Sequence, residues 1–320
     1  MTDPVRVVAA GDPFVPSSLI ARAVGDELGD RPLDLRQLEP GPARDGAEEE
    51  LIEALAGARV LVTRSGPVTD RVLDACPGLG LVAVCGSRPA GVDLDAAKIR
   101  DVRVCHAPGC DAAATAEHTL GLMLAVLRRV PWAGTETPAY ERAGLELEDL
   151  PVGLIGHGAV GDRVARVLCA FGAQVMVYDP YVRGEIHGLR VSSLDDLLAR
   201  SRVITLHAGD GPGTRGLIGA RELALLPPGA VVVNTARGPL LDEGALCDAL
   251  ESGRVSAAAL DTGGGETGPD HARLLGLADR VVLTPRLGGA TRAAARKAAR
   301  TAAEEVGRWL RGQPPAHGLT

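Results

Sequence analysis

The chain has 320 residues, 46% of them hydrophobic and 23% charged, so it is long enough for two domains and can bury a large core. Its formal net charge of −7 argues against nucleic acid as the main partner, because phosphate binding needs a basic surface. The sequence has no apolar run of about 18 residues and no signal peptide before its first expected strand, so we expect a cytoplasmic protein that does not bind membranes.

Short apolar segments alternate with helical patterns along most of the chain. Strands are expected at Val5–Ala10, Val60–Arg64, Leu81–Cys85, Val102–His106, Val152–Gly156, Gln174–Asp179, Val203–His207, Ala230–Thr235, Ala257–Asp261 and Arg280–Thr284. Helices are expected at Ser17–Leu28, Ala47–Leu55, Ala114–Arg129, Val160–Phe171, Glu243–Ser252 and Ala290–Trp309. Many of these strands are apolar throughout, which is typical of parallel strands covered on both faces. The alternation predicts an α/β protein with doubly wound sheets.

A glycine motif, G-x-G-x-x-G, places Gly156, Gly158 and Gly161 between an expected strand and an expected helix. A second strand then ends at Asp179, 18 residues after Gly161. This strand–turn–helix–strand context predicts a dinucleotide-binding site. Gly156 would permit the tight turn, Gly158 the approach of a pyrophosphate to the backbone, and Gly161 close packing of the helix. The N-terminus of that helix would attract the pyrophosphate through its free N–H groups.

Asp179 is expected to accept hydrogen bonds from the adenosine ribose. Its charge favours NAD over NADP, although the nearby Arg183 leaves NADP open. The alternative is that the glycines are turn residues only and that Asp179 is a surface acid. His157, between the first two glycines, is interpreted as a loop residue.

Further segments of recognisable sequence follow one another along the chain. They are residues 116–125, 206–207, 214–219, 233–238, 259–261 and 283–291. With the glycine motif they make the chain resemble the D-isomer-specific 2-hydroxyacid dehydrogenases, which include phosphoglycerate, glycerate and formate dehydrogenases. The resemblance implies a homodimer of chains with two Rossmann-like domains. The substrate domain would comprise residues 1–100, completed by 290–320, and the NAD-binding domain, residues 101–289, would be inserted into it.

The resemblance also implies roles for individual residues. Arg237 falls on the catalytic arginine that anchors the substrate carboxylate and polarises the 2-keto oxygen, a task suited to a planar, permanently charged guanidinium. Asp261 falls on the residue that contacts the nicotinamide carboxamide, and Glu266 on the acid partner of the catalytic histidine. The three glycines before Glu266 are unusual for the family. Further cofactor contacts are expected from Ala159, Val160, His207, Thr235, Ala236 and Gly288.

The catalytic histidine of the family is replaced here by Arg286. Histidine exchanges a proton near neutral pH, whereas arginine, with a pKa above about 12, does not. Arg286 either stabilises a developing oxyanion while water or another group supplies the proton, or pairs with Glu266 in a protein that turns over poorly, or binds an extra anionic group of the substrate. His106 and His118 are candidates for a substitute acid, with structural roles as the alternative.

A second departure lies in the loop that, in the family, offers backbone N–H groups to the substrate carboxylate. It contains Gly86, Ser87 and Arg88, and a glycine usually stands in place of Arg88. Arg88 and Arg286 together would make a cationic pocket, so we expect a substrate with a second anionic group; the alternative is that Arg88 points to solvent. Asp111, in place of a usual asparagine, either pairs with one of these arginines or caps the following helix.

The sequence thus predicts an enzyme, an NAD-dependent oxidoreductase that transfers a hydride between NAD(H) and a small 2-keto or 2-hydroxy acid. The alternative is an NAD-binding sensor or scaffold with little or no dehydrogenase activity. The six cysteines form no C-x-x-C pair and no zinc-like spacing, so reduced thiols and no metal are expected. The chain ends at Thr320, and we expect none of the regulatory domain that some phosphoglycerate dehydrogenases carry.

Overall fold

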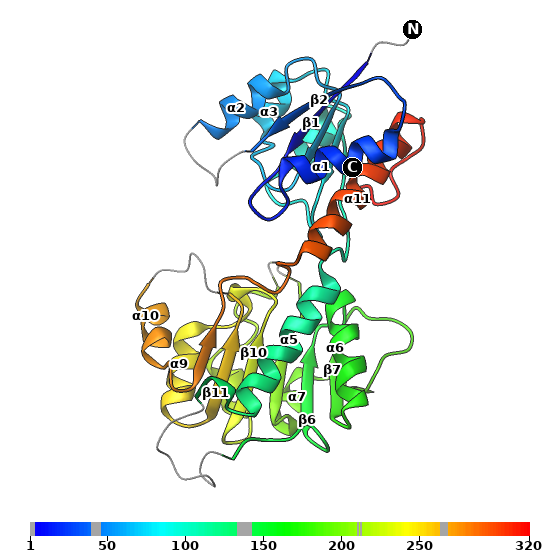
Figure 1. The fold of residues 1–320 in the computed structure, drawn as a ribbon. Helices are drawn as coiled ribbons and strands as arrows, with labels where there is room; N and C mark the ends of the chain where they lie inside the picture. The colour runs from blue at the N-terminus through cyan, green and yellow to red at the C-terminus, as the bar shows by residue number, and fades with distance from the viewer. Residues whose placement is uncertain (1–3, 40–45, 133–142, 210, 212, 263–267) are drawn as a thin grey trace. The chain divides into compact units, whose positions relative to one another are not determined.

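The computed structural model describes residues 4–39, 46–132, 143–209, 211, 213–262 and 268–320. The chain forms two compact units, both visible in Figure 1. The first unit comprises Met1–Asp111 and Ala290–Thr320, and the second comprises Ala112–Gly289. The first boundary lies at residue 111 rather than at residue 100, because the strand at Arg103–Cys105 pairs with the sheet of the first unit.

The first unit is built on five parallel strands in the order β2-β1-β3-β4-β5. The strands are β1 (Val5–Ala10), β2 (Leu33–Leu38), β3 (Val60–Thr63), β4 (Leu81–Val84) and β5 (Arg103–Cys105). The helices are α1 (Ser17–Leu28), α2 (Ala47–Ala54), α3 (Asp70–Ala75), α4 (Leu94–Ile99) and α11 (Arg292–Leu310). Alternate residues of β1 face opposite sides: Val7 and Ala9 pack with α1 and α11, while Val8 and Ala10 pack with the other three helices. Both faces of the sheet are therefore buried.

The second unit contains seven parallel strands in the order β12-β11-β10-β9-β6-β7-β8. The strands are β6 (Pro151–Ile155), β7 (Gln174–Tyr178), β8 (Leu189–Arg190), β9 (Val203–Leu206), β10 (Ala230–Asn234), β11 (Val255–Leu260) and β12 (Val281–Leu283). The helices are α5 (Ala112–Leu127), α6 (Ala159–Ala170), α7 (Leu194–Arg200), α8 (Ala220–Leu225), α9 (Glu243–Glu251) and α10 (Pro269–Gly276), with short 3-10 turns at Val130–Trp132 and Gly238–Leu240.

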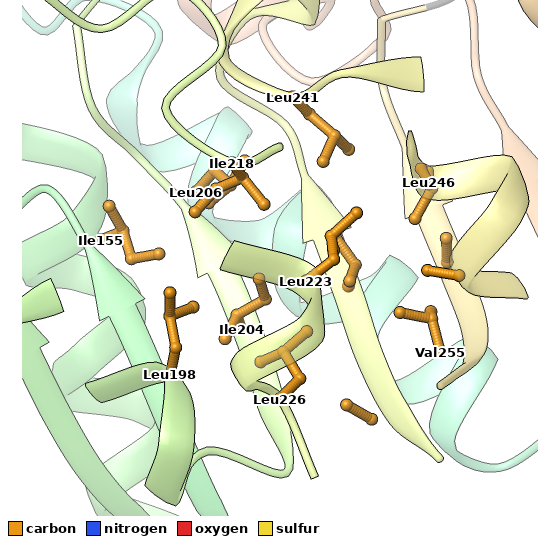
Figure 2. Packing of buried hydrophobic residues seen from close by; sticks show 14 of the residues in the cluster. Ile155, Leu198, Ile204, Leu206, Ile218, Leu223, Leu226, Leu241, Leu246 and Val255 are labelled. Atoms are coloured by element: carbon orange, nitrogen blue, oxygen red, sulfur yellow. The ribbon is translucent and has the colours of Figure 1, made fainter. Parts of the chain in front are cut away.

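Two apolar layers cover the seven-stranded sheet. Helices α5 and α6 pack on one face, and α7 to α10 pack on the other. Figure 2 shows the second of these layers, a buried cluster that contains Ile204 and Leu206 of β9 together with Leu223, Leu226 and Leu246. The doubly wound α/β fold predicted from the sequence is therefore confirmed.

Several short elements were not predicted from the sequence. Strand β2 has the sequence LDLRQL, is only half-buried and lies at the edge of its sheet, so it lacks the continuous apolar pattern of the inner strands. Helices α3 and α4 have six residues each, too few for a helical period to stand out. Within the described residues, no helix is long and apolar enough to cross a membrane.

Each sheet has a point where the strand order changes direction. In the second unit the chain runs outward from β6 to β7 and β8 and then returns to the other side of β6 at β9. In the first unit the corresponding change lies between β1 and β3. Ligands of doubly wound sheets bind beside such points, at the carboxyl ends of the strands. The two loops after β6 and β9 are thus the first place to look for a cofactor site.

Candidate active site

The glycine motif lies at this position, in the turn between β6 and α6. Gly156 has φ +93°, and a Cβ on it would stand 2.5 Å from the backbone nitrogen of Ala208, after β9. A Cβ on Gly161 would collide with the carbonyl oxygen of Gly156. Both positions therefore require glycine for reasons internal to the protein.

Gly158 differs from the other two glycines. A Cβ built on it would meet no heavy atom of the described residues within 4 Å, so protein packing does not require glycine there. Gly158 is the N-cap residue of α6 and has no side chain to accept the first N–H groups of that helix. A surface kept bare at a helix N-terminus fits the close approach of a pyrophosphate.

Asp179, directly after β7, lies beside this turn. Its carboxylate accepts the backbone N–H of His157 at 2.7 Å and those of Tyr181 and Val182 at 2.8 and 3.1 Å. Partial burial opposes ionisation, but these three hydrogen bonds outweigh it and lower the pKa of Asp179 below its ordinary value. The carboxylate is ionised at neutral pH, ties the glycine turn to β7, and keeps acceptor capacity for sugar hydroxyls.

Two imidazoles lie close to the turn. His157 has a side chain only 5% exposed, and its Nε2 has no hydrogen-bond partner among the described residues; a carboxylate oxygen of Asp162 lies 3.8 Å away. His207, at the end of β9, has its Nε2 3.0 Å from the hydroxyl of Thr205. Burial, assisted by the neighbouring His157, lowers the pKa of His207 to about 3. His207 is therefore neutral under physiological conditions and does not add positive charge to the site.

Arg237 follows β10 in a loop organised by Asn234. The Asn234 side chain donates from Nδ2 to the Arg237 carbonyl at 2.9 Å and accepts the N–H of Ala236 at 3.0 Å. The Arg237 guanidinium is half-buried and donates one hydrogen bond, of 2.6 Å, to the Ala236 carbonyl. No carboxylate among the described residues pairs with it, so most of its N–H groups remain available to an anion.

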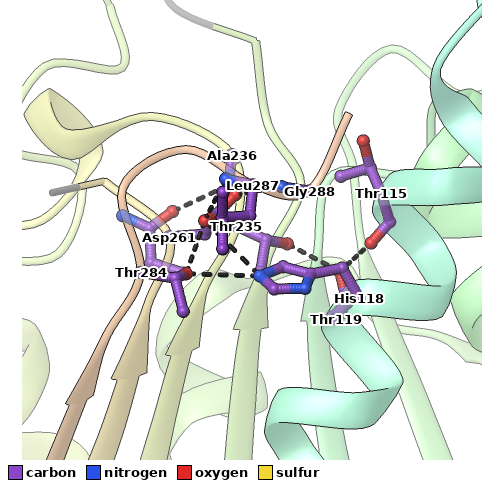
Figure 3. A network of polar contacts seen from close by, with 10 residues as sticks. Thr115, His118, Thr119, Thr235, Ala236, Asp261, Thr284, Leu287 and Gly288 are labelled. Carbon is purple, nitrogen blue, oxygen red and sulfur yellow. Dashed lines mark hydrogen bonds and ion pairs between the residues drawn. The ribbon is translucent and has the colours of Figure 1, made fainter. Parts of the chain in front are cut away.

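Asp261, at the end of β11, is the centre of a buried polar network shown in Figure 3. Its Oδ1 accepts the Thr284 hydroxyl at 2.5 Å and the N–H of Leu287 at 2.7 Å, and its Oδ2 accepts the N–H of Gly288 at 2.7 Å. His118, from α5, places Nε2 3.2 Å from the Thr284 hydroxyl and 3.4 Å from Asp261. The carboxylate thus holds the loop after β12, and its burial leaves little of it accessible to a cofactor.

Thr235 belongs to the same network. The Thr119 hydroxyl donates to the Thr115 carbonyl at 2.7 Å and lies 2.6 Å from the Thr235 hydroxyl. Because Thr119 gives its hydrogen to Thr115, Thr235 must be the donor in the second contact. The Thr235 hydroxyl can therefore offer only lone pairs to a ligand.

Arg286 lies in the loop that Asp261 holds. Its backbone has φ +58° and its side chain is exposed, with no ion pair among the described residues. Glu266, its partner in one of the three interpretations, lies outside the described residues, as do the glycines before it. The interpretation of an Arg286–Glu266 ion pair stays a prediction.

The predicted substrate loop lies in the first unit, after β4. The Ser87 hydroxyl donates to Asp111 at 2.5 Å, and the Ser87 carbonyl lies 3.1 Å from Nδ1 of His106. Asp111 accepts this hydroxyl, and its expected role as the cap of α5 stays a prediction. Arg88 is exposed and has no partner in the described part of the chain.

One arginine of the first unit was not singled out from the sequence. Arg64 follows β3 and is half-buried, with its guanidinium carbon 5.8 Å from the centre of the Phe14 ring. Its Nη1 lies 3.3 Å from where a Cβ of Gly86 would stand, so the guanidinium flanks the predicted substrate loop. Its position could have identified it as a site residue, because it follows a strand beside the point where the strand order of the sheet changes direction.

The structure therefore brings the predicted residues together in three groups. The glycine turn, Asp179 and His207 form one group, and Asn234–Arg237, Asp261 and Gly288 lie at the ends of β10 to β12 in the same unit. Gly86, Ser87 and Arg88 form the third group, in the first unit. No cluster of three potential metal ligands occurs among the described residues.

Comparison with known proteins gives a consistent result. Residues 120–288 match the family model described as "D-isomer specific 2-hydroxyacid dehydrogenase, NAD binding domain". The chain is 40% identical over 316 residues to a D-3-phosphoglycerate dehydrogenase of Mycobacterium bovis, covering 96% of this chain and 57% of the relative. It therefore spans little more than half the length of that relative.

Two further similarities cover both proteins more evenly. A hydroxypyruvate reductase of Thermotoga maritima is 35% identical over 258 residues, which is 78% of this chain and 84% of the relative. The crystal structure of the TT0316 protein from Thermus thermophilus superposes with a TM-score of 0.84 at 31% identity, covering 99% of this chain and 100% of the other.

Proposed function

This chain belongs to the D-isomer specific 2-hydroxyacid dehydrogenase family, and we propose that it transfers a hydride between NAD(H) and carbon 2 of a small 2-keto or 2-hydroxy acid. The observation that carries the proposal is the turn between β6 and α6, where Gly158 presents a bare helix N-terminus beside the ionised Asp179. Arg237, an arginine without a carboxylate partner among the described residues, follows β10 in the same unit.

These residues fit a bound NAD(H). The N–H groups at the start of α6 would take the pyrophosphate, and Asp179 would take the ribose hydroxyls and repel a 2′-phosphate. Bound NADH supplies the hydride. The guanidinium of Arg237 would bind the substrate carboxylate and polarise the keto oxygen. Its positive charge would then stabilise the negative charge that develops on that oxygen.

Arg286 is a poor proton donor, because a guanidinium does not release its proton near neutral pH. We assign it to electrostatic stabilisation of the substrate, with water or another acid supplying the proton. If only the proton donor is missing, Arg286→His should raise the rate of reduction of simple 2-keto acids. An unchanged rate would indicate that the pocket itself has been reshaped.

The finer proposal is a substrate with a second anionic group, such as a phosphate. Arg64 and Arg88 support it, because both lie at the predicted substrate loop and neither has a carboxylate partner among the described residues. The curated relatives named D-3-phosphoglycerate dehydrogenase give further support. Arg64→Gln should raise the KM of a phosphorylated acid more than that of a matched unphosphorylated acid. Arg22→Gln, an exposed arginine on α1, is the control.

The test of the main proposal is the oxidation of NADH, followed by absorbance, with a panel of 2-keto acids. Turnover should be lost about 100-fold or more in Arg237→Gln, while NADH still binds. Arg200→Gln, on the exposed end of α7, serves as the control. Tight NADH binding without turnover of any acid would instead favour the NAD-binding sensor or scaffold. A homodimer in the cytoplasm stays a prediction, and sedimentation would measure the oligomeric state.

A further inference from the structure

Arg286 has a backbone conformation that an arginine rarely adopts. Its φ of +58° is one of four positive values at non-glycine residues in the described part of the chain, and two of the other three belong to aspartates. A long side chain gains nothing locally from the left-handed region, so surrounding contacts must hold it there.

Those contacts come from both sides of Arg286. On the C-terminal side, the N–H groups of Leu287 and Gly288 donate to the two oxygens of the buried Asp261. On the N-terminal side, the Thr284 hydroxyl donates to Asp261, and the N–H of Arg286 donates to the Thr284 carbonyl at 3.0 Å. The residue is therefore fixed between two points anchored on one carboxylate.

His118 extends this arrangement to α5. Thr284 gives its one hydroxyl hydrogen to Asp261, so it can only accept in its 3.2 Å contact with His118. Nε2 of His118 must therefore carry a proton and donate it, which fixes the tautomer of the neutral ring. Gly288 closes the packing, because a Cβ there would stand 2.9 Å from Asp261 and 3.7 Å from the His118 ring.

We propose that Thr284 and His118 are positioning residues, which act through Asp261 to hold Arg286 in its left-handed conformation and aim its guanidinium at the anionic substrate. This inference rests on the proposed function only in taking the anionic substrate as the ligand of Arg286. The network itself is a property of the second unit and can be tested without turnover.

The kinetic test compares Thr284→Val with Thr284→Ser. The valine variant loses the hydroxyl and should raise the KM of the keto acid about tenfold, whereas the serine variant keeps the hydroxyl and should restore most of the loss. The Kd of NADH, measured by fluorescence, should change less than about twofold, since Arg286 and not the cofactor turn is displaced. Equal KM values in the two variants, or an equal rise in the Kd of NADH, would overturn the proposal. His118→Gln against His118→Phe gives a second pair, because glutamine can still donate to Thr284.

The stability test is independent of catalysis. Asparagine tolerates the left-handed region, so Arg286→Asn should raise the melting temperature by about 2–4 °C, while Arg286→Lys should leave it unchanged. In the Thr284→Val background, where Arg286 is free to relax, the gain from asparagine should disappear. An equal gain in both backgrounds, or no gain in the wild-type background, would contradict the proposal. If the protein shows no measurable turnover, but Arg286→Asn still raises the melting temperature in the wild type and not in Thr284→Val, the proposed function is refuted and this inference stands.

Discussion

In each unit, the first β–α turn follows the strand at which the strand order changes direction. The two turns differ in the acceptors that their backbone N–H groups have. In the first unit, the carboxylate of Asp12 accepts the N–H groups of Phe14 and Val15 at 2.8 and 2.7 Å, and Glu39 accepts that of Ser17 at 2.8 Å. In the second unit, no described residue accepts from the N–H groups of Gly158, Ala159 or Val160. The first turn is closed by the protein's own acids, and the second is left open to an external anion.

This difference is local and chemical rather than topological. Both turns contain a glycine that packing requires: Gly11 would collide with the backbone of Pro16 and Ser17 if it carried a Cβ, as Gly161 would with Gly156. What distinguishes the second turn is Gly158, whose missing side chain serves no internal contact. A fold shared by two units therefore says little about binding until the partners of the terminal N–H groups are known.

The largest effect should come from filling the open turn. Gly158→Val should lower NADH affinity about 100-fold, or ~2.7 kcal/mol, because the side chain would occupy the space of the pyrophosphate. The melting temperature should stay close to that of the wild type, since a Cβ at this position would meet no described heavy atom within 4 Å. Titration of NADH fluorescence and a thermal melt measure the two quantities.

The matched comparison is Gly161→Val. That side chain would collide with the Gly156 carbonyl, so this variant should lose folding stability as well as NADH binding. A Gly158→Val protein that binds NADH normally would show that the open turn is not the cofactor site.

A smaller effect is expected in the closed turn. Asp12→Ala removes the acceptor of two N–H groups and should lower the free energy of unfolding by about 1–2 kcal/mol, with little change in NADH affinity. Asp12→Asn keeps an acceptor oxygen and should lose less. Urea unfolding measures the stability. A large loss of NADH affinity in Asp12→Ala would contradict the division of roles between the two turns.

The sequence allowed the open turn to be predicted but not the closed one. Glycine spacing after an apolar strand is a local pattern, and it correctly placed Gly156 and Gly161 in a strand–turn–helix unit. The contact between Glu39 and Ser17 joins residues 22 positions apart through tertiary packing, which no local pattern encodes. The same holds for Asp261 and its partners Leu287 and Gly288 in the loop after β12, which lie 26 and 27 positions away in the chain.

The fold was easier to predict than the site because buried parallel strands are apolar along their whole length. Strand β9, all four residues of which are buried, was evident from sequence, whereas the half-exposed β2 was not. Arg64 was interpreted as the end of a strand, since its proximity to Gly86 depends on how β3 and β4 lie together. Contacts between side chains from different strands are the part of a site that cannot be predicted from a single sequence.

The smallest effect concerns acidity at the open turn, where His207 follows β9. The folded state keeps His207 neutral, since burial lowers its pKa to about 3, while the unfolded chain binds a proton near pH 6.5. The unfolded state therefore holds more protons at pH 5.5, and stability contributed by the neutral ring is present above pH 6.5 and lost as the pH falls below it. Because the residue is only half-buried, the loss in the free energy of unfolding between pH 7.5 and 5.5 should be less than about 1 kcal/mol.

Urea unfolding of His207→Gln should show a correspondingly weaker decline in the free energy of unfolding over this pH range, whereas replacement of the exposed His187 by Gln should leave the decline as in the wild type. An identical pH dependence in wild type and His207→Gln would mean that the folded protein accepts a proton at this imidazole, and that the open turn carries a positive charge of its own in mild acid.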